Sequence, residues 1–62
     1  MDPDTNLEEQ LSLTKWIEEH QDNMSDKDLR TETYRLAELV VALHGWIIQG
    51  GFLPKAWRKD GN

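Results

Sequence analysis

The sequence contains no cysteine among its 62 residues, and this absence removes two means by which small proteins supplement a thin core. Neither a disulfide framework nor a zinc site built on thiolates is available, and nothing indicates an oxidising compartment. The stretch from Met1 to Asp4 is acidic and lacks the basic and apolar segments of a secretory signal, so we expect a cytoplasmic protein. A chain this short forms one domain, residues 1–62, and must obtain its stability from packing within or between chains.

Basic residues are also scarce, since 7 lysines and arginines oppose 12 acids and leave a net charge of −5. The imbalance lies in residues 1–32, which carry ten acids and three bases, whereas residues 33–62 carry two acids and four bases. Nucleic-acid binding depends largely on neutralising phosphates, so DNA or RNA is a poor first guess as the partner. One basic-aromatic cluster could stack on a base but is better interpreted as a solvated tail. Its members are Lys55, Trp57, Arg58 and Lys59.

The sequence lacks the groups that a catalyst or a metal site requires. There is no glycine-rich phosphate loop, because Gly50 and Gly51 are not followed by a lysine and a helix start. His20 and His44 stand 24 residues apart, and few acids are placed to join either of them. These acids are Glu18, Glu19 and Glu38. Since a metal site needs several convergent ligands, we expect no metal, no cofactor, no catalytic residue and no enzymatic activity.

No uninterrupted hydrophobic run reaches the length of a membrane span. The longest candidate, residues 36–53, contains Glu38 and His44 and has two glycines near its end. A spanning helix needs about 20 predominantly apolar residues, so we expect a buried helix here and no membrane partner.

A first helix is predicted over residues 7–20 from a capping signal and from apolar spacing. Asn6 followed three residues later by Glu9 has the form of a capping box, and Asp2 followed by Pro3 offers an earlier start. The apolar residues recur at intervals of three and four, as on one face of a helix. They are Leu7, Leu11, Leu13, Trp16 and Ile17.

A second, longer helix is predicted over residues 26–49. Residues 21–25 should form a turn, because Asp and Asn compete with a helix by bonding their own backbone. Ser25 and Asp28 then have the spacing of a capping box, with Met24 and Leu29 placed to make a hydrophobic staple.

The second helix carries more apolar surface than the first can cover. Its main seam has the four-and-three spacing of helices packed lengthwise, at Leu29, Thr33, Leu36, Val40, Leu43 and Ile47. Further apolar residues lie on either side of this seam, at Leu39, Val41, Trp46 and Ile48. Gly45, costly inside a helix, could admit a ring or another backbone at close range. A helix that is apolar nearly all round is normally covered on more than one side, so we expect a homo-oligomer, with a dimer favoured, in a four-helix arrangement.

The residues after the second helix are predicted to fold back over its end. We expect Gly51 to take the left-handed conformation that ends helices, with Phe52 packed against Ile47. Pro54 forbids continuation of the helix and can begin a further helical turn, which would bring Trp57 back over the bundle end.

The stretch from Ala42 to Trp57, ALHGWIIQGGFLPKAW, resembles the C-terminal part of small, uncharacterised proteins from actinobacterial phages. The resemblance covers about a quarter of the chain. It implies no known activity, but it implies a phage-encoded accessory protein, and such proteins often act by binding host machinery.

These observations predict an all-α helical hairpin with a folded-back segment at residues 50–62, acting as a non-catalytic module that binds and modulates a host protein. The residues expected at its interface, with a partner or between copies, are Leu36, Leu39, Val40, Leu43, Trp46, Ile47, Phe52, Leu53 and Trp57. One alternative is an acidic mimic of nucleic acid, although acids at this density are common on solvated faces. Its face would be Glu8, Glu9, Glu18, Glu19, Asp22, Asp26 and Asp28. The other alternative is a nucleic-acid binder that uses the basic-aromatic cluster.

Overall fold

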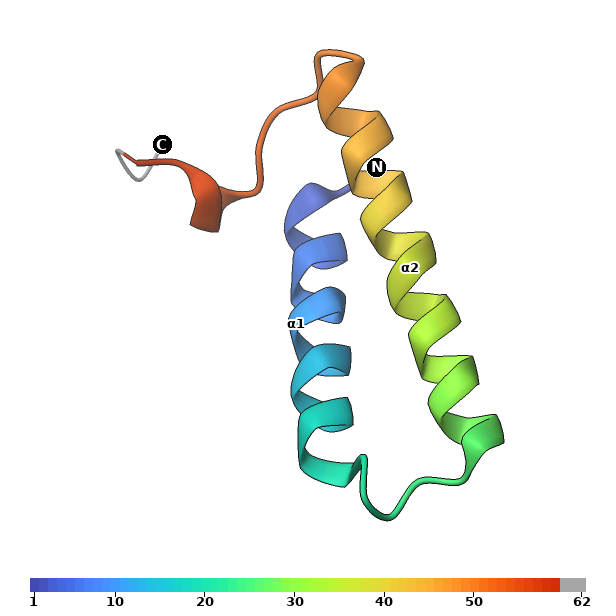
Figure 1. The fold of residues 1–62 in the computed structure, drawn as a ribbon. Coiled ribbons are helices and arrows are strands. Elements are labelled where there is room, and N and C mark those ends of the chain that lie inside the picture. The colour runs from blue at the N-terminus through green and yellow to red at the C-terminus, as the bar shows by residue number, and fades with distance from the viewer. Residues whose placement is uncertain (60–62) are drawn as a thin grey trace.

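The computed structural model describes residues 1–59, which form two long helices and one short helical turn (Figure 1). Helix α1 spans Pro3–His20, helix α2 spans Asp26–Ile48, and the 3-10 turn η1 spans Lys55–Trp57. The two helices run antiparallel, and the chain after α2 crosses back past the N-terminal end of α1 (Figure 1). The predicted all-α hairpin is confirmed, and the last three residues of the expected segment 50–62 lie outside the described residues.

Helix α1 begins one turn earlier than the capping-box pattern predicts. The carboxylate of Asp2 accepts hydrogen bonds from the backbone amides of Asp4 at 3.0 Å and Thr5 at 3.3 Å, and from the Thr5 hydroxyl at 2.7 Å. Pro3 takes the first helical position, where its missing N–H leaves no helical bond unmade. The predicted cap at Asn6 is therefore wrong, and the alternative start at Asp2 and Pro3 is confirmed.

Helix α2 begins at Asp26, as predicted. The Ser25 hydroxyl accepts a hydrogen bond from the Asp28 amide at 3.1 Å, and the Ser25 backbone is extended. A bond of 2.9 Å from the Asn23 amide to the His20 carbonyl closes the preceding turn. This helix start is readable from the sequence because both partners of the cap lie within one turn of each other.

Helix α2 ends at Ile48, one residue earlier than predicted, in a Schellman motif. The Gly50 amide donates to the Ile47 carbonyl at 3.1 Å, and the Gly51 amide donates to the Trp46 carbonyl at 2.9 Å. Gly50, with a φ of 98°, is the left-handed residue, so the prediction of Gly51 was wrong by one position. Gly51 is required for another reason, because a Cβ at this position would overlap the Trp46 indole.

The core between the two helices is small. Among residues 1–59, the buried hydrophobic side chains of the helices are Leu7, Leu39 and Leu43. The molecule measures 39 × 21 × 13 Å, and its radius of gyration of 13.5 Å exceeds the roughly 11 Å expected for a compact chain of this length. A single copy therefore leaves much of its apolar surface uncovered.

Candidate protein-binding surface

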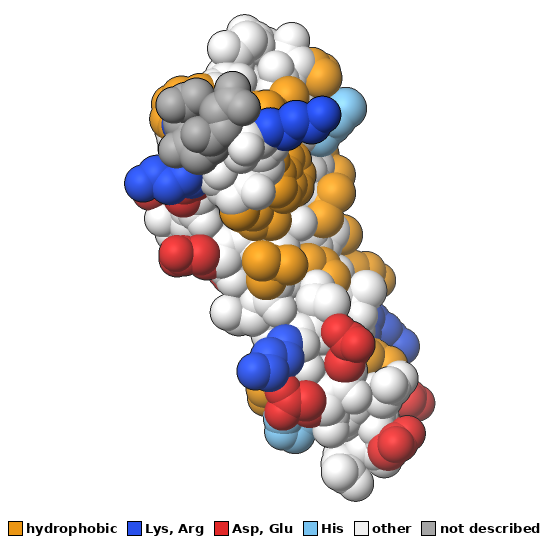
Figure 2. All heavy atoms as spheres, turned by 90° about the vertical axis from the view of Figure 1, so that its left-hand side faces the viewer, with side chains coloured by type: hydrophobic (Ala, Val, Ile, Leu, Met, Phe, Trp, Pro, Cys, Tyr) orange, Lys and Arg blue, Asp and Glu red, His pale blue; other side chains and the backbone are white. Residues whose placement is uncertain are grey.

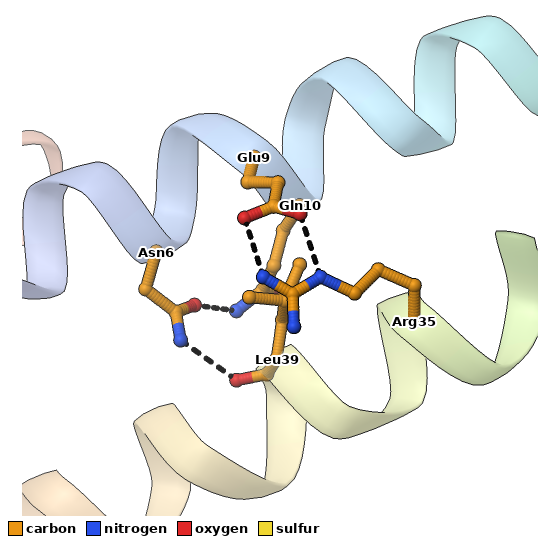
Figure 3. A network of polar contacts seen from close by, with 5 residues as sticks. All are labelled: Asn6, Glu9, Gln10, Arg35 and Leu39. Atoms are coloured by element: carbon orange, nitrogen blue, oxygen red, sulfur yellow. Dashed lines mark hydrogen bonds and ion pairs between the residues drawn. The ribbon is translucent and has the colours of Figure 1, made fainter.

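A buried amide between the helices sets how α1 lies on α2 (Figure 3). Asn6 is buried, and its Nδ2 donates to the Leu39 carbonyl at 3.0 Å while its Oδ1 accepts from Gln10 Nε2 at 2.6 Å. Sliding one helix along the other would break the bond to the Leu39 carbonyl and leave Asn6 Nδ2 unpaired inside the protein, which costs about 1–3 kcal/mol. Asn6, expected as a cap, thus selects one register of the hairpin.

An ion pair joins the same two helices at their exposed edge (Figure 3). Arg35 donates Nε to Glu9 Oε2 at 2.7 Å and Nη2 to Glu9 Oε1 at 2.9 Å, which is a bidentate arrangement. The hydrogen bonds from Arg35 lower the pKa of Glu9, and the same bonds raise the pKa of Arg35. Because the pair is solvent-exposed, it orients the helices more than it stabilises them.

The C-terminal segment is anchored to the opposite end of the chain. The backbone amide of Lys55 donates to Asp4 Oδ1 at 2.6 Å, so a carboxylate from the first turn of α1 meets the start of η1. Pro3 and Pro54, which precede these two residues in the sequence, are both fully buried. The turn itself is closed by a bond of 2.9 Å from the Trp57 amide to the Pro54 carbonyl.

The C-terminal apolar patch, which we define as Phe52, Leu53 and Trp57, is held in place yet stays exposed. Trp46 donates Nε1 to the Phe52 carbonyl at 2.9 Å and meets the Phe52 ring edge-on, with centroids 5.5 Å apart. Arg58 donates Nε to the Leu53 carbonyl at 3.1 Å and places its guanidinium carbon 5.6 Å from the centre of the Phe52 ring. Phe52, Leu53 and Trp57 nonetheless remain 56%, 40% and 49% exposed.

A groove of about 240 Å³ lies beside this patch. Trp57 forms one wall, and the helices supply the others through Gln10, Val40, Leu43, His44 and Ile47. Figure 2 views the molecule from the side of α1 and the C-terminal segment, and it shows hydrophobic side chains over the middle and upper parts of this side. A concave apolar surface with an aromatic rim is typical of sites that anchor a side chain from another protein.

The structure separates the nine residues predicted for the interface into three groups. Leu39 and Leu43 are buried between α1 and α2, so they hold the single chain together. The half-buried members are Leu36, Trp46 and Ile47, and the exposed members are Val40, Phe52, Leu53 and Trp57. The structure therefore leaves four of the nine residues fully accessible on the surface.

Sequence reasoning did not include three strongly exposed residues of α2 among the site residues. These are Tyr34, Val41 and Ile48. Val41 and Ile48 were identified from the sequence as apolar residues beside the main seam of the second helix, but Tyr34 was not considered. Their common spacing of seven residues was the signal that could have found them, because it places all three on one stripe of a helix.

The seven acids considered as a mimic of nucleic acid are not gathered on one face. Glu9 is paired with Arg35, and Glu8 lines a shallow pocket between α1 and η1. The other five are exposed around the turn between α1 and α2, at Glu18, Glu19, Asp22, Asp26 and Asp28. Figure 2 shows more acidic side chains in its lower part, toward this turn, than in its upper part.

The two histidines stand apart in the structure. His20 bonds the Trp16 carbonyl through Nδ1 at 2.9 Å and stacks on the Trp16 ring, whereas His44 is exposed on α2. Within residues 1–59, no group of three His, Asp or Glu side chains is placed to hold a metal ion. Neither helix of this described part has the length and apolar character needed to cross a membrane.

Comparisons of the chain with protein-family models, curated proteins and solved structures find no match.

Proposed function

We propose that this protein is a non-catalytic interaction module that binds another protein through the C-terminal apolar patch and modulates it. One observation carries the proposal: the patch stays exposed although Trp46, Arg58 and Asp4 hold its segment by hydrogen bonds. Tight protein interfaces depend on a few anchors rich in Trp, Tyr and Arg. Anchors that are ordered before binding lose less conformational entropy on association.

The patch alone is too small for tight binding. Burying a large hydrophobic side chain contributes about 1.5–3 kcal/mol, so covering three half-exposed ones yields roughly 3 kcal/mol. Association costs at least about 4 kcal/mol in lost translational and rotational freedom. A partner must therefore also engage the adjacent groove. A homodimer that presents two patches would raise the apparent affinity further, and we assign that assembly to this protein.

The charges beside the patch indicate the kind of partner. Lys55, Arg58 and Lys59 flank Trp57 in the sequence, so the complementary surface would be an apolar pocket with an acidic rim. The resemblance to phage proteins supports a host protein as the bearer of that pocket.

Affinity capture from an actinobacterial lysate tests the proposal with a matched pair of tryptophan variants. Trp57→Ala removes the centre of the patch, whereas Trp16→Ala removes a comparably exposed tryptophan from the far part of α1. We expect Trp57→Ala to weaken capture at least tenfold, as truncation of an anchor does, and Trp16→Ala to leave it unchanged.

Equal capture by the parent protein and by Trp57→Ala would refute the proposal. Capture that ignores the Trp57 change but disappears at high salt would instead favour the acidic mimic, because surface charge interactions are screened by salt. Retardation of an oligonucleotide at low salt, lost in Trp57→Ala, would favour the nucleic-acid alternative.

A further inference from the structure

The face of α2 that points away from α1 is uncovered within the described chain, and we infer that a second copy of the same chain covers it. We define this outer face as Tyr34, Ala37, Val41, Gly45 and Ile48. The two α2 helices pack antiparallel about a two-fold axis at Val41, which gives a four-helix dimer. The inference rests on the homodimer assigned above and adds which face the copies share and in what register.

The exposure of α2 identifies this face. Tyr34, Val41 and Ile48 are 65%, 70% and 68% exposed, more than any other large hydrophobic residue of the described chain. Their spacing of seven residues places them on one stripe along the helix. Leu39, which is buried against α1, lies on the opposite side, because two residues of an α-helix correspond to a rotation of roughly 200°.

The stripe is complementary to itself when the two helices run in opposite directions. With the two-fold axis at Val41, Tyr34 faces the partner's Ile48, Ala37 faces the partner's Gly45, and Val41 faces its own copy. Large residues meet large ones at the ends, and small ones meet between them. Apart from the neighbouring residues and backbone of α2 itself, nothing in residues 1–59 lies within 4 Å of the place where a Gly45 Cβ would stand, so this space is open. A two-fold interface requires such self-complementarity, since every contact occurs twice.

The shape of the outer face also suits helix packing. A shallow groove on it is lined by Tyr34, Ala37, Glu38, Val41 and Ala42. Four of these residues stand at positions i, i+3, i+4 and i+7, which is the set that forms a hole for a side chain of a facing helix. The same two-fold axis brings the partner's His44 toward this hole, next to Glu38.

Charge selects the antiparallel arrangement over the parallel one. In the antiparallel dimer each Glu38 lies opposite a histidine, whereas a parallel dimer would place Glu38 against Glu38. The acidic turn ends would also meet in a parallel dimer, since residues 18–32 carry six acids and two bases. Antiparallel packing separates these ends and opposes the helix dipoles.

The surface available matches what a stable dimer needs. One chain exposes 4843 Å². A compact monomer of its mass, 7.3 kDa, would expose about 4,200 Å². If two copies each covered the excess, the interface would bury about 1,300 Å² in total, within the range of roughly 1,200–2,000 Å² typical of specific complexes.

Single cysteines test the register directly, because the chain has none of its own. We expect Val41→Cys to form a disulfide-linked dimer under mild oxidation. Facing Cα atoms on helices packed 8–10 Å apart come within about 4–5 Å, which a disulfide spans. Tyr34→Cys and Ile48→Cys should cross-link poorly alone but should join in an equimolar mixture. Leu11→Cys, an exposed site on α1, is the matched control and should stay monomeric on a denaturing gel.

Two other cross-linking patterns would overturn the inference. Self-linking of Tyr34→Cys and Ile48→Cys as efficient as that of Val41→Cys would show parallel helices. Cross-linking at none of the three positions would show that the copies do not share this face.

The mass in solution separates this inference from the proposals on which it rests. We expect the parent protein to have a mass of twice 7.3 kDa in solution. The dissociation constant of the Val41→Glu dimer should be at least tenfold larger than that of the parent, because two carboxylates would face each other at the axis. Leu11→Glu should keep the dimer, and circular dichroism should show both variants folded. A monomeric parent would remove the homodimer and this register together. A dimer that Val41→Glu leaves intact would remove the register alone, and lysate capture through Trp57 reports independently on partner binding.

Discussion

Asn6 joins the two helices through one end of its side-chain amide and is held by its own helix through the other end. Its Nδ2 donates to the Leu39 carbonyl of α2, and its Oδ1 accepts from Gln10 on its own helix. Across the described residues, no buried side-chain nitrogen or oxygen atom lacks a hydrogen-bond partner. With so few buried leucines beside it, this one amide carries much of the specificity of the helix pairing, because apolar contacts alone tolerate sliding.

Replacing Asn6 with aspartate should destabilise the protein more than replacing it with alanine. Alanine removes one hydrogen bond at each end of the amide, which costs about 1–2 kcal/mol in the free energy of unfolding. Aspartate is nearly the same size, but it places a carboxylate with no donor against the Leu39 carbonyl in a buried position, which costs several kcal/mol more. Urea denaturation followed by circular dichroism measures both values.

The exposed turn residue Asn23 supplies the control for that comparison. Asn23→Asp makes the same chemical change at a solvated position and should shift the free energy of unfolding by less than about 0.5 kcal/mol. If Asn6→Asp and Asn6→Ala were equally stable, the bond to Leu39 would not be the feature that sets the register.

At the scale of elements, the Glu9–Arg35 pair joins α1 and α2 at their exposed edge, and the carboxylate of Asp2 caps the N-terminus of α1. Hydrogen bonds from Arg35 lower the pKa of Glu9, and the side-chain bond from Thr5 lowers the pKa of Asp2. The charged form of each carboxyl group is therefore more stable in the folded state than in the unfolded state. Each therefore contributes to stability at neutral pH and loses that contribution in acid.

Stability should fall as the pH drops below the ordinary carboxyl values of 4.5 for Glu9 and 3.8 for Asp2, and should go on falling through their lower folded-state values. Glu9→Gln should be less stable than the parent at pH 7, and the difference should shrink toward pH 2 as the parent's carboxylate is protonated. Thermal unfolding across this range measures the effect. Glu8→Gln, one residue away and without an ion pair in the described chain, should follow the parent. A difference that grew in acid would contradict the assigned pair.

The start of η1 donates a hydrogen bond to the other end of the chain, where the carboxylate of Asp4 accepts it. Asp4→Ala removes the acceptor of the Lys55 amide, so we expect the C-terminal segment to detach more often from α1. Trypsin cleavage after Lys55 and Arg58 should then become several-fold faster, while cleavage within the helices stays slow. Asp22→Ala, a change at the exposed turn, should leave these rates unaltered. Equal cleavage rates for the parent and Asp4→Ala would show that other contacts hold the segment.

At the scale of the whole molecule, the features readable from the sequence are those whose causes are local. The start of α2 at Ser25 and its end near the two glycines were predicted within one residue, since cap and partner are neighbours in the chain. The role of Asn6 was missed because its partner lies 33 residues away. The division of the apolar residues of α2 between the face toward α1 and the outer face was missed for a similar reason. Which residues of α2 face α1 depends on helix rotation, and Asn6 and the buried leucines set that rotation together.

That rotation leaves Gly45 on the outer face with open space above it, and a leucine at this position can distinguish the single chain from the assembly. Leucine favours a helix over glycine by up to about 1 kcal/mol, so Gly45→Leu should keep the helical circular dichroism of one chain. In the proposed dimer, its side chain would occupy the space that the partner's Ala37 needs. We expect the melting temperature of the parent to rise with protein concentration, as a dimer requires, and that of Gly45→Leu to be independent of concentration. Gly45→Ala should behave like the parent, because one methyl group can be accommodated beside another. If the melting temperature of Gly45→Leu rose with concentration as steeply as that of the parent, the copies would be associating through some other face.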